Sequence, residues 1–598
     1  MGSRRDDQLR ILGQRFKSLG MSRRNFMKIA AAAVAGTATT AGMERYVGPG
    51  AAAAPRRALL RQEVGPDQVF YHYSLRDDPV SFDWNLNLYC AAAVQVASGL
   101  LTFDENLNAI PDWAETFTSN EDASVWTFNL RPDNQGWTNG TETRPVTAQD
   151  FVYSWERQLN PANAAAYAGF LFDVKNAEKY NLAEEGVTAE DLGVKALDEW
   201  TVEVTMEGPR GYFPQVVGYI ASVPSPQWAV EELGSDVWAS GNVPLWSNGP
   251  YKLDRWEHDV IVEMSPNAGH WNAENLGFEK VFVPIVPSDA SVLTYERGEG
   301  DQQFDWVNIP ASDLTRYQDD PELSEQLKQY VFPGIWMLVP SNGQEPFQND
   351  EVGLQVRRAL SHAIDRSRLV ELTNGLAIEA NCMVPIGVFG YIDDPEIAAL
   401  QAYDPAMAME LLAGTPYEGG QNWPEVTMNM RGQESEYNSD LMANDIVAQL
   451  QENLGMNVSI QVWPEASWRP ELFKNEFQLV WIRWWYDYPD PNNGYGDMYY
   501  SQKASGKRQA WSNAEFDDLV NQGKGEPDPE ARLEIYTQAE TIIQEDVGYI
   551  PVVFRVDQYA FKPWVKDVAV NRQGFTVPEG NIYIDMTSAV RVEGRPEG

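Results

Sequence analysis

The chain has 598 residues, enough for about three to five domains, and its 43% hydrophobic and 22% charged residues are typical of a folded protein. A net charge of −42 at pH 7 repels nucleic-acid phosphates and anionic lipid surfaces, so we expect no nucleic-acid partner. Two cysteines, Cys90 and Cys382, and four scattered histidines exclude a disulfide scaffold and a thiolate metal cluster. We therefore expect no cofactor and no metal site.

The N-terminus has the pattern of an export signal. Basic residues at 22–28 precede an apolar, alanine-rich run at 29–42, which is shorter than the ~20 residues that span a bilayer. Adjacent Arg23 and Arg24 are similar to the twin-arginine signal, which exports folded chains. No cysteine follows the apolar run, so a lipoprotein anchor has no attachment point. We expect residues 1–61 to be a signal and linker, either cleaved or kept as an anchor, and the protein to be extracytoplasmic, in a periplasm or at the cell surface.

Helical and strand periods alternate along the rest of the chain. A short helix is predicted between Asp289 and Arg297, where Gly298 ends it, and a strand at 304–309 follows. Residues 356–364 form a further predicted helix, because their apolar side chains recur on one face.

Residues 426–462 show the alternation most clearly. Alternate apolar residues predict strands at 426–430 and 458–462, and apolar residues at helical spacing from Leu441 to Leu450 predict a helix between them. Such a unit requires a parallel pair of strands with a right-handed crossover. Because the chain has no internal repeat of roughly 20–50 residues, solenoids and propellers are excluded. The fold class is mixed α/β, in several lobes.

No catalytic motif stands out. The chain lacks a nucleophile elbow, a phosphate-binding loop, a zinc-protease motif and a dinucleotide-binding motif. His362 is interpreted as a packing or capping residue of its predicted helix. We therefore expect a protein without enzymatic turnover.

The densest chemical signal is the aromatic and acidic run at 481–493. It begins as a predicted strand, 477–485, and breaks at two prolines. Two interpretations are open: the rings stack on a ligand held by carboxylates, or they pack a core strand that ends in turn residues. Since alternate residues of a strand face opposite ways, at most about half of the rings can line one cleft.

Five blocks in the chain resemble family 5 of the extracellular solute-binding proteins of ABC transporters, the oligopeptide- and dipeptide-binding group. They occur in the family's order and cover nearly all of the chain after the signal. The blocks are Val146–Arg157, Asn248–Leu253, Val356–Arg366, Asp487–Asn493, and the pair Ile550–Val552 and Lys562–Val565.

The resemblance implies a large three-lobed clamp that closes by hinge motion. Lobe I would combine residues 62–99, 225–342 and 546–598, with lobe II at 100–224 and lobe III at 343–545. The protein would capture an oligopeptide between lobes I and III and deliver it to the membrane permease of an ABC transporter. It would act as a monomer. Two alternatives stay open: an oligosaccharide-binding member of the family, and a secreted glycan hydrolase.

The resemblance also implies ligand-binding residues. Asp487 would pair with the α-ammonium of a peptide, Tyr167 would contact the peptide, and Trp468 would line the cleft, although packing roles for Tyr167 and Trp468 stay open. Around Asp487, the chain departs from the family by carrying Trp485 and Tyr486, whose rings would narrow a peptide pocket or stack on sugars. The expected set of ligand-binding residues is completed by Arg483.

A second departure lies near the N-terminal end of the clamp. The segment Asn85–Tyr89 lacks the acidic residue that some members place there.

The export signal gives the first testable prediction. Replacing Arg23 and Arg24 by Lys should retain the precursor inside the cell, because the twin-arginine route requires the arginine pair. The measurement is the location of a folded passenger fused behind residues 1–60. A passenger that still appears outside after the double replacement would refute the assignment.

Overall fold

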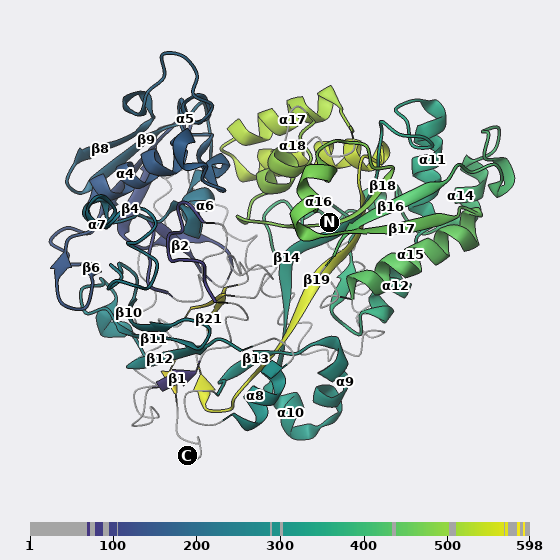
Figure 1. The fold of residues 1–598 in the computed structure, drawn as a ribbon. Coiled ribbons are helices and arrows are strands. Elements are labelled where there is room, and N and C mark those ends of the chain that lie inside the picture. The colour runs from purple at the N-terminus through teal and green to yellow at the C-terminus, as the bar shows by residue number, and fades with distance from the viewer. Residues whose placement is uncertain are drawn as a thin grey trace, which may run out of the picture. The chain divides into compact units, whose positions relative to one another are not determined.

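The computed structural model describes most of the chain after the predicted signal (Figure 1). All described residues belong to the compact unit Gly48–Gly598. The predicted signal at 1–61, Cys90 and residues 88–89 lie outside the described residues. The described ranges are 69–71, 78–87, 95–104, 106–286, 290–298, 303–432, 438–501, 510–566, 569–571, 583–585 and 590–591. Within them, no helix is long and apolar enough to cross a membrane.

Two four-stranded sheets form the first half of the fold. One has the order β1-β12-β11-β10, in which β1 is parallel to β12 and the other pairs are antiparallel. The other is antiparallel, with the order β4-β5-β9-β8, and helix α4 (Ala148–Leu159) packs on β8 and β9. Their strands are β1 (Val69–Tyr71), β4 (Ala114–Ser119), β5 (Val125–Leu130), β8 (Val194–Asp198), β9 (Thr201–Thr205), β10 (Tyr251–Glu257), β11 (Ile261–Pro266) and β12 (Lys280–Pro284).

A seven-stranded mixed sheet forms the second half. Its order is β13-β19-β14-β18-β16-β17, and β15 also pairs with β19. Figure 1 shows β14 and β19 as two long neighbouring strands that extend from the region of α8–α10 to the helices of the second half. The strands are β13 (Trp306–Asn308), β14 (Leu327–Pro340), β15 (Ala377–Glu379), β16 (Val426–Arg431), β17 (Val458–Trp463), β18 (Leu479–Trp485) and β19 (Ile550–Phe561).

Helices cover both faces of the seven-stranded sheet. In β14, Ile335 and Met337 face one hydrophobic core, whereas Trp336 and Leu338 face another, as alternation along a strand requires. The first core also contains side chains of α16 (Glu465–Leu472), α17 (Ala514–Gly525) and α18 (Pro529–Glu545). The second contains side chains of α11 (Glu351–His362), α12 (Arg366–Leu372), α14 (Pro405–Leu411) and α15 (Ser439–Leu454).

The remaining elements are short helices and two- or three-residue strands. The other helices are α5 (Ala177–Asn181), α6 (Phe213–Val217), α7 (Gln227–Leu233), α8 (Ser291–Arg297), α9 (Ala311–Asp319), α10 (Pro321–Gln326) and α13 (Pro395–Ala399). The short strands are β2 (Leu101–Phe103), β3 (Ala109–Pro111), β6 (Trp137–Thr138), β7 (Thr143–Arg144), β20 (Val565–Lys566), β21 (Ala569–Asn571), β22 (Tyr583–Asp585) and β23 (Val590–Arg591).

The structure confirms the mixed α/β class and the elements predicted from periodicity. The β16–α15–β17 unit has the predicted parallel strands, and Gly455 ends α15 with a φ of 68°, a conformation that favours glycine. His362 lies at the end of α11, with its Nδ1 2.6 Å from the Ala402 carbonyl oxygen. The seven-stranded sheet combines strands from the segments expected in lobes I and III, and the lobe boundaries themselves stay a prediction.

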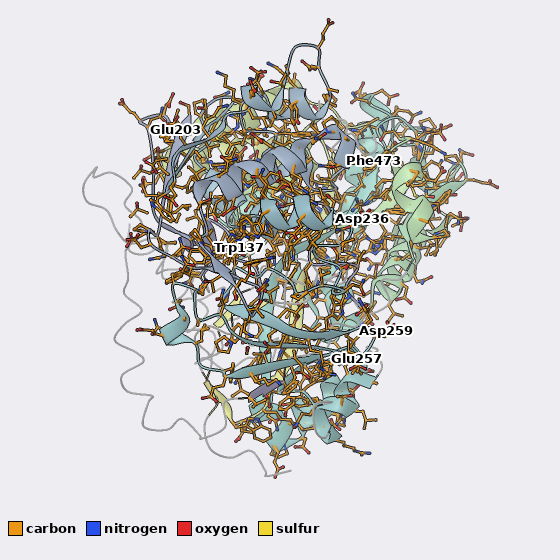
Figure 2. All side chains as sticks on the ribbon, turned by 60° about the vertical axis from the view of Figure 1, so that its left-hand side comes forward. Trp137, Glu203, Asp236, Glu257, Asp259 and Phe473 are labelled. Atoms are coloured by element: carbon orange, nitrogen blue, oxygen red, sulfur yellow. The ribbon has the colours of Figure 1, made fainter. Side chains whose placement is uncertain are left out.

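Acidic side chains are common at the surface, as Figure 2 shows for several of them. Asp236, Glu257 and Asp259 are exposed, whereas Trp137 is buried and donates from its indole nitrogen to Asp150, 3.2 Å away. The Asp150 carboxyl is itself buried, and the loss of hydration raises its pKa to about 6.

A buried ion pair ties α4 to the segment before β2. The Arg157 guanidinium donates two hydrogen bonds to Asp83, of 3.0 and 2.5 Å, and the side chains are only 5% and 2% exposed. The Trp238 indole adds a third donor to Asp83 at 3.1 Å. Three donors around one buried carboxylate compensate for its lost hydration.

Removing one partner of this pair should destabilise the protein. Arg157→Met would leave the buried Asp83 carboxylate uncompensated and lower the free energy of unfolding by about 3–5 kcal/mol. The double variant Asp83→Asn/Arg157→Met should recover most of this loss, because no buried charge remains. Guanidinium unfolding of the three proteins measures both effects. A double variant no more stable than the single one would show that the loss comes from packing and not from charge.

Candidate functional site

The loop after β18 begins at a close contact with β14. Trp485 lies opposite Gly334 in the pairing of the two strands, and the Tyr486 N–H donates to the Pro333 carbonyl oxygen at 2.9 Å. A Cβ atom on Gly334 would come within 2.3 Å of the Trp485 ring, so a residue with a side chain cannot occupy this position without displacing the ring. This contact fixes where the chain leaves the sheet and where Asp487 lies.

One side chain, Asn493, organises the loop. Its amide oxygen accepts from the Trp484 indole nitrogen at 2.9 Å and from the Asp487 N–H at 3.1 Å. Its amide nitrogen lies 3.5 Å from a carboxylate oxygen of Asp497, which also accepts from the Tyr488 hydroxyl at 2.7 Å. Asn493 therefore holds two carboxylate-bearing residues close together.

The environment of Asp487 disfavours its negative charge. The side chain is partly buried, and the loss of hydration, followed by the nearby Asp497 carboxylate, raises the pKa of Asp487 to about 7. Asn493 and the more distant Arg469 act in the opposite direction. A positive charge brought to this carboxylate would relieve both unfavourable effects.

Tyr219 interacts with both Asp487 and Tyr167. Tyr219 is buried, and its pKa is raised well above the ordinary value by burial and then by Tyr167 and Asp487. Its ring centroid lies 5.5 Å from that of Tyr167 and 5.0 Å from that of Phe170, whose ring in turn lies 6.1 Å from that of Tyr488. The site thus combines a carboxylate with a surrounding group of aromatic rings, drawn from segments far apart in the sequence.

Arg483 and Trp485 lie together on the preceding strand. The Arg483 guanidinium carbon is 4.5 Å from the centre of the half-buried Trp485 ring, which also packs edge-on against Phe332 and Trp336 at 5.4 and 5.6 Å. A planar guanidinium over an indole is a favourable arrangement. Their contact with a ligand stays a prediction.

Trp468 and Tyr486 lie in the hydrophobic core between the sheet and α16–α18. Trp468 is 4% exposed and stacks on Phe477, with ring centroids 6.0 Å apart. Tyr486 is fully buried, and its hydroxyl donates to the Met383 carbonyl oxygen at 3.1 Å. In this structure both rings pack the protein interior, and their predicted contact with a ligand draws no support from these positions.

Three residues of the site were not identified from the sequence. Tyr219 and Asp497 lie outside the matching blocks, and no local pattern distinguishes them from other residues. Asn493 is the last residue of the Asp487–Asn493 block, where a turn residue is expected. The hydrogen bonds that its amide makes to Trp484 and Asp487 form only in the folded loop. Among the described residues, no group of three His, Cys, Asp or Glu could hold a metal ion.

Comparison with known proteins identifies the family of the chain. The family model of bacterial extracellular solute-binding proteins, family 5 middle, matches residues 108–506. The oligopeptide-binding protein OppA of Bacillus subtilis is 26% identical over 82% of this chain and 86% of its own length. The periplasmic OppA of Salmonella typhimurium is 28% identical over 81% of this chain and 86% of its own.

Solved structures agree on the fold. The murein tripeptide-binding protein MppA of Escherichia coli aligns with a TM-score of 0.69 at 24% identity, covering 89% of this chain and 100% of that chain. The Haemophilus influenzae OppA in complex with the peptide RPPGFSPFR gives a TM-score of 0.69 at 23% identity, with the same coverage. The matched family model spans more than half of the sequence, and the chain belongs to family 5 of the bacterial extracellular solute-binding proteins.

Proposed function

We propose that the protein is the extracytoplasmic binding component of an ABC importer, which captures an oligopeptide and delivers it to a membrane permease. It would be exported by the twin-arginine route and act as a monomer without chemical turnover. The observation that carries the peptide assignment is Asp487, a partly buried carboxylate with a pKa raised to about 7. It interacts with Tyr219, whose ring contacts that of Tyr167. Relatives named for oligopeptide binding support this choice.

A peptide's amino end meets the chemical requirements of this site. An ammonium group supplies a full positive charge and three hydrogen-bond donors, which a carboxylate removed from water requires. The raised pKa of Asp487 indicates that the surrounding protein does not fully compensate the charge. Binding an ammonium therefore gains more here than at an exposed aspartate.

The two other functions have less support. An oligosaccharide carries no positive charge, so it would not relieve the effects that raise the pKa of Asp487. A glycan hydrolase would convert its ligand, and the relatives are named as binding proteins.

The amine contact can be tested by combining two single changes. Asp487→Asn keeps the size of the side chain and removes its charge, which should cost about 2–5 kcal/mol of peptide affinity. The dissociation constant should rise by roughly 30-fold or more. Acetylating the peptide's amino end should weaken binding to the wild type similarly, because it removes the other charge of the pair.

The two changes together should cost much less than their sum, since either one alone abolishes the pair. Calorimetry of both proteins with free and acetylated peptide gives the four affinities. If the wild type binds the two peptides equally well, Asp487 does not hold the amino end.

The pH dependence of binding gives a separate prediction. With a pKa of about 7 in the ligand-free protein, Asp487 becomes protonated as the pH falls below 7, and affinity should drop by up to about tenfold per pH unit. Above pH ~8 the peptide's own amino group deprotonates, so affinity should fall again. Calorimetry from pH 5 to 9 at constant ionic strength should give an optimum between about 7 and 8.

Asp487→Asn is the matched control for this profile, because the Asn side chain does not titrate. Its affinity, though lower, should be constant on the acid side. An acid limb that persists unchanged in this variant would assign the titration to another group.

A further inference from the structure

A tyrosine outside the matching blocks, Tyr212, touches the loop that carries Asp487. Tyr212 lies between β9 and α6 and is 2% exposed. Its ring is parallel to that of Tyr488, with an angle of 4° and centroids 6.1 Å apart. Tyr488 directly follows Asp487 in the chain, and its hydroxyl donates to Asp497, so Tyr212 packs on a residue within the site.

The Tyr212 ring also contacts Arg532 of α18, which is one partner of a buried ion pair. The Arg532 guanidinium carbon lies 5.5 Å from the ring centre, and it donates two 2.7 Å hydrogen bonds to Asp490 of the same loop. The Arg532 and Asp490 side chains are 8% and 4% exposed. The loop is thus held to α18 by a strong bidentate pair, and Tyr212 covers that pair.

The Tyr212 hydroxyl is held by a carboxylate, Asp173, that interacts with two cations. It donates to Asp173, which also accepts from Arg210 at 2.7 Å. Burial alone would raise the pKa of Asp173, but Arg210 and then Lys524 of α17 outweigh it and lower the pKa to about 2. A carboxylate beside the β4-β5-β9-β8 sheet therefore interacts with a lysine from the helices of the seven-stranded sheet.

The chain segments around Pro209 and Gly525 also lie close together near Tyr212. A Cβ atom on Gly525, the last residue of α17, would lie 3.6 Å from the Pro209 Cβ, which is ordinary van der Waals contact. Tyr212, Asp173 and Pro209 form one side of this interface, and Tyr488, Arg532 and Lys524 form the other. We refer to these six residues as the Tyr212 contact.

We propose that Tyr212 is a positioning residue for the Asp487 site, which it orders by docking on Tyr488 and on the Arg532–Asp490 pair. The proposal rests on the proposed function for its effect on ligand binding. We expect this docking to exist before a ligand binds. The Tyr212 contact joins two bodies, one built on the β4-β5-β9-β8 sheet and the other on the seven-stranded sheet. By holding these bodies together around the site, it lengthens the time for which a ligand is retained.

The docking is tested first without any ligand. Spin labels at Leu197→Cys on β8 and Leu441→Cys on α15, both exposed positions, report the distance between the two bodies in a Cys90→Ser background. Cys382 is 1% exposed and should not be labelled. Tyr212→Ala should lengthen and broaden the distance distribution, whereas Tyr212→Phe, which keeps the ring, should stay close to the wild type. A distribution unchanged by Tyr212→Ala would overturn the proposal.

Ligand retention is tested second, with trialanine as the probe and tryptophan fluorescence as the stopped-flow signal. An aromatic contact of this kind contributes about 0.5–1.5 kcal/mol, so Tyr212→Ala should raise the dissociation rate constant roughly three- to tenfold. Tyr212→Phe should restore a rate within about twofold of the wild type.

Tyr153→Ala is the control for the simple loss of a partly buried ring that packs against the core. Tyr153 lies on α4 in the same body as Tyr212, and the groups that act on it are Arg157, Glu231 and Asp83. This variant should leave the dissociation rate unchanged, and an equal increase would overturn the positioning role. If the wild type does not bind trialanine while Tyr212→Ala still changes the label distance, the docking stands and the peptide assignment is what fails.

Discussion

The antiparallel pairing of β14 with β19 is the constraint on which the rest of the structure depends. The two strands pair from Leu327 and Ala560 at one end to Leu338 and Ile550 at the other. Their register shifts between Val331 and Ile335, so the residues around Pro333 bulge from the ladder. Because β18 is the next strand in the sheet, and because the Tyr486 N–H donates to Pro333, the loop after β18 that carries Asp487 is anchored at this irregular point.

A buried ion pair from β19 packs against the residues of this bulge. Arg555 donates to Asp557 at 2.6 Å, and its guanidinium carbon lies 4.3 Å from the centre of the Phe332 ring and 5.1 Å from that of Trp485. Both charged side chains are almost completely buried. The bulge is thus packed by a compensated charge pair and two aromatic rings, which links the geometry of the long strands to the strand that carries the site.

The Asp487 site is maintained at a cost in stability. Its pKa of about 7 in the folded chain is above the value of about 3.9 for an unfolded aspartate, so folding favours the protonated form. The ligand-free protein is therefore stabilised at this group below pH ~4, and that contribution is lost as the pH rises through about 7. A cation at the site reverses this preference, and the free energy released contributes to binding.

Sequence patterns predicted the elements better than they predicted the site. The β16–α15–β17 unit follows from local periods of two and 3.6 residues, which each segment carries by itself. Tyr212 and Tyr219 carry no such signal, because their roles arise only when segments almost 300 residues away in the sequence are packed against them. Resemblance assigned Asp487 and Tyr167 to ligand binding, but it could not show that Tyr486, the neighbour of Asp487, faces the core.

The most direct test of the central claim is native mass spectrometry of the protein purified after export. We expect a population with bound mass that is released on unfolding and consists of peptides, each of which gains a label at its amino end on reductive methylation. That result would mean that the site selects ligands with a free ammonium group. Bound material made of hexose units, or of peptides whose amino ends are blocked, would contradict the assignment of Asp487 as the amine-binding residue.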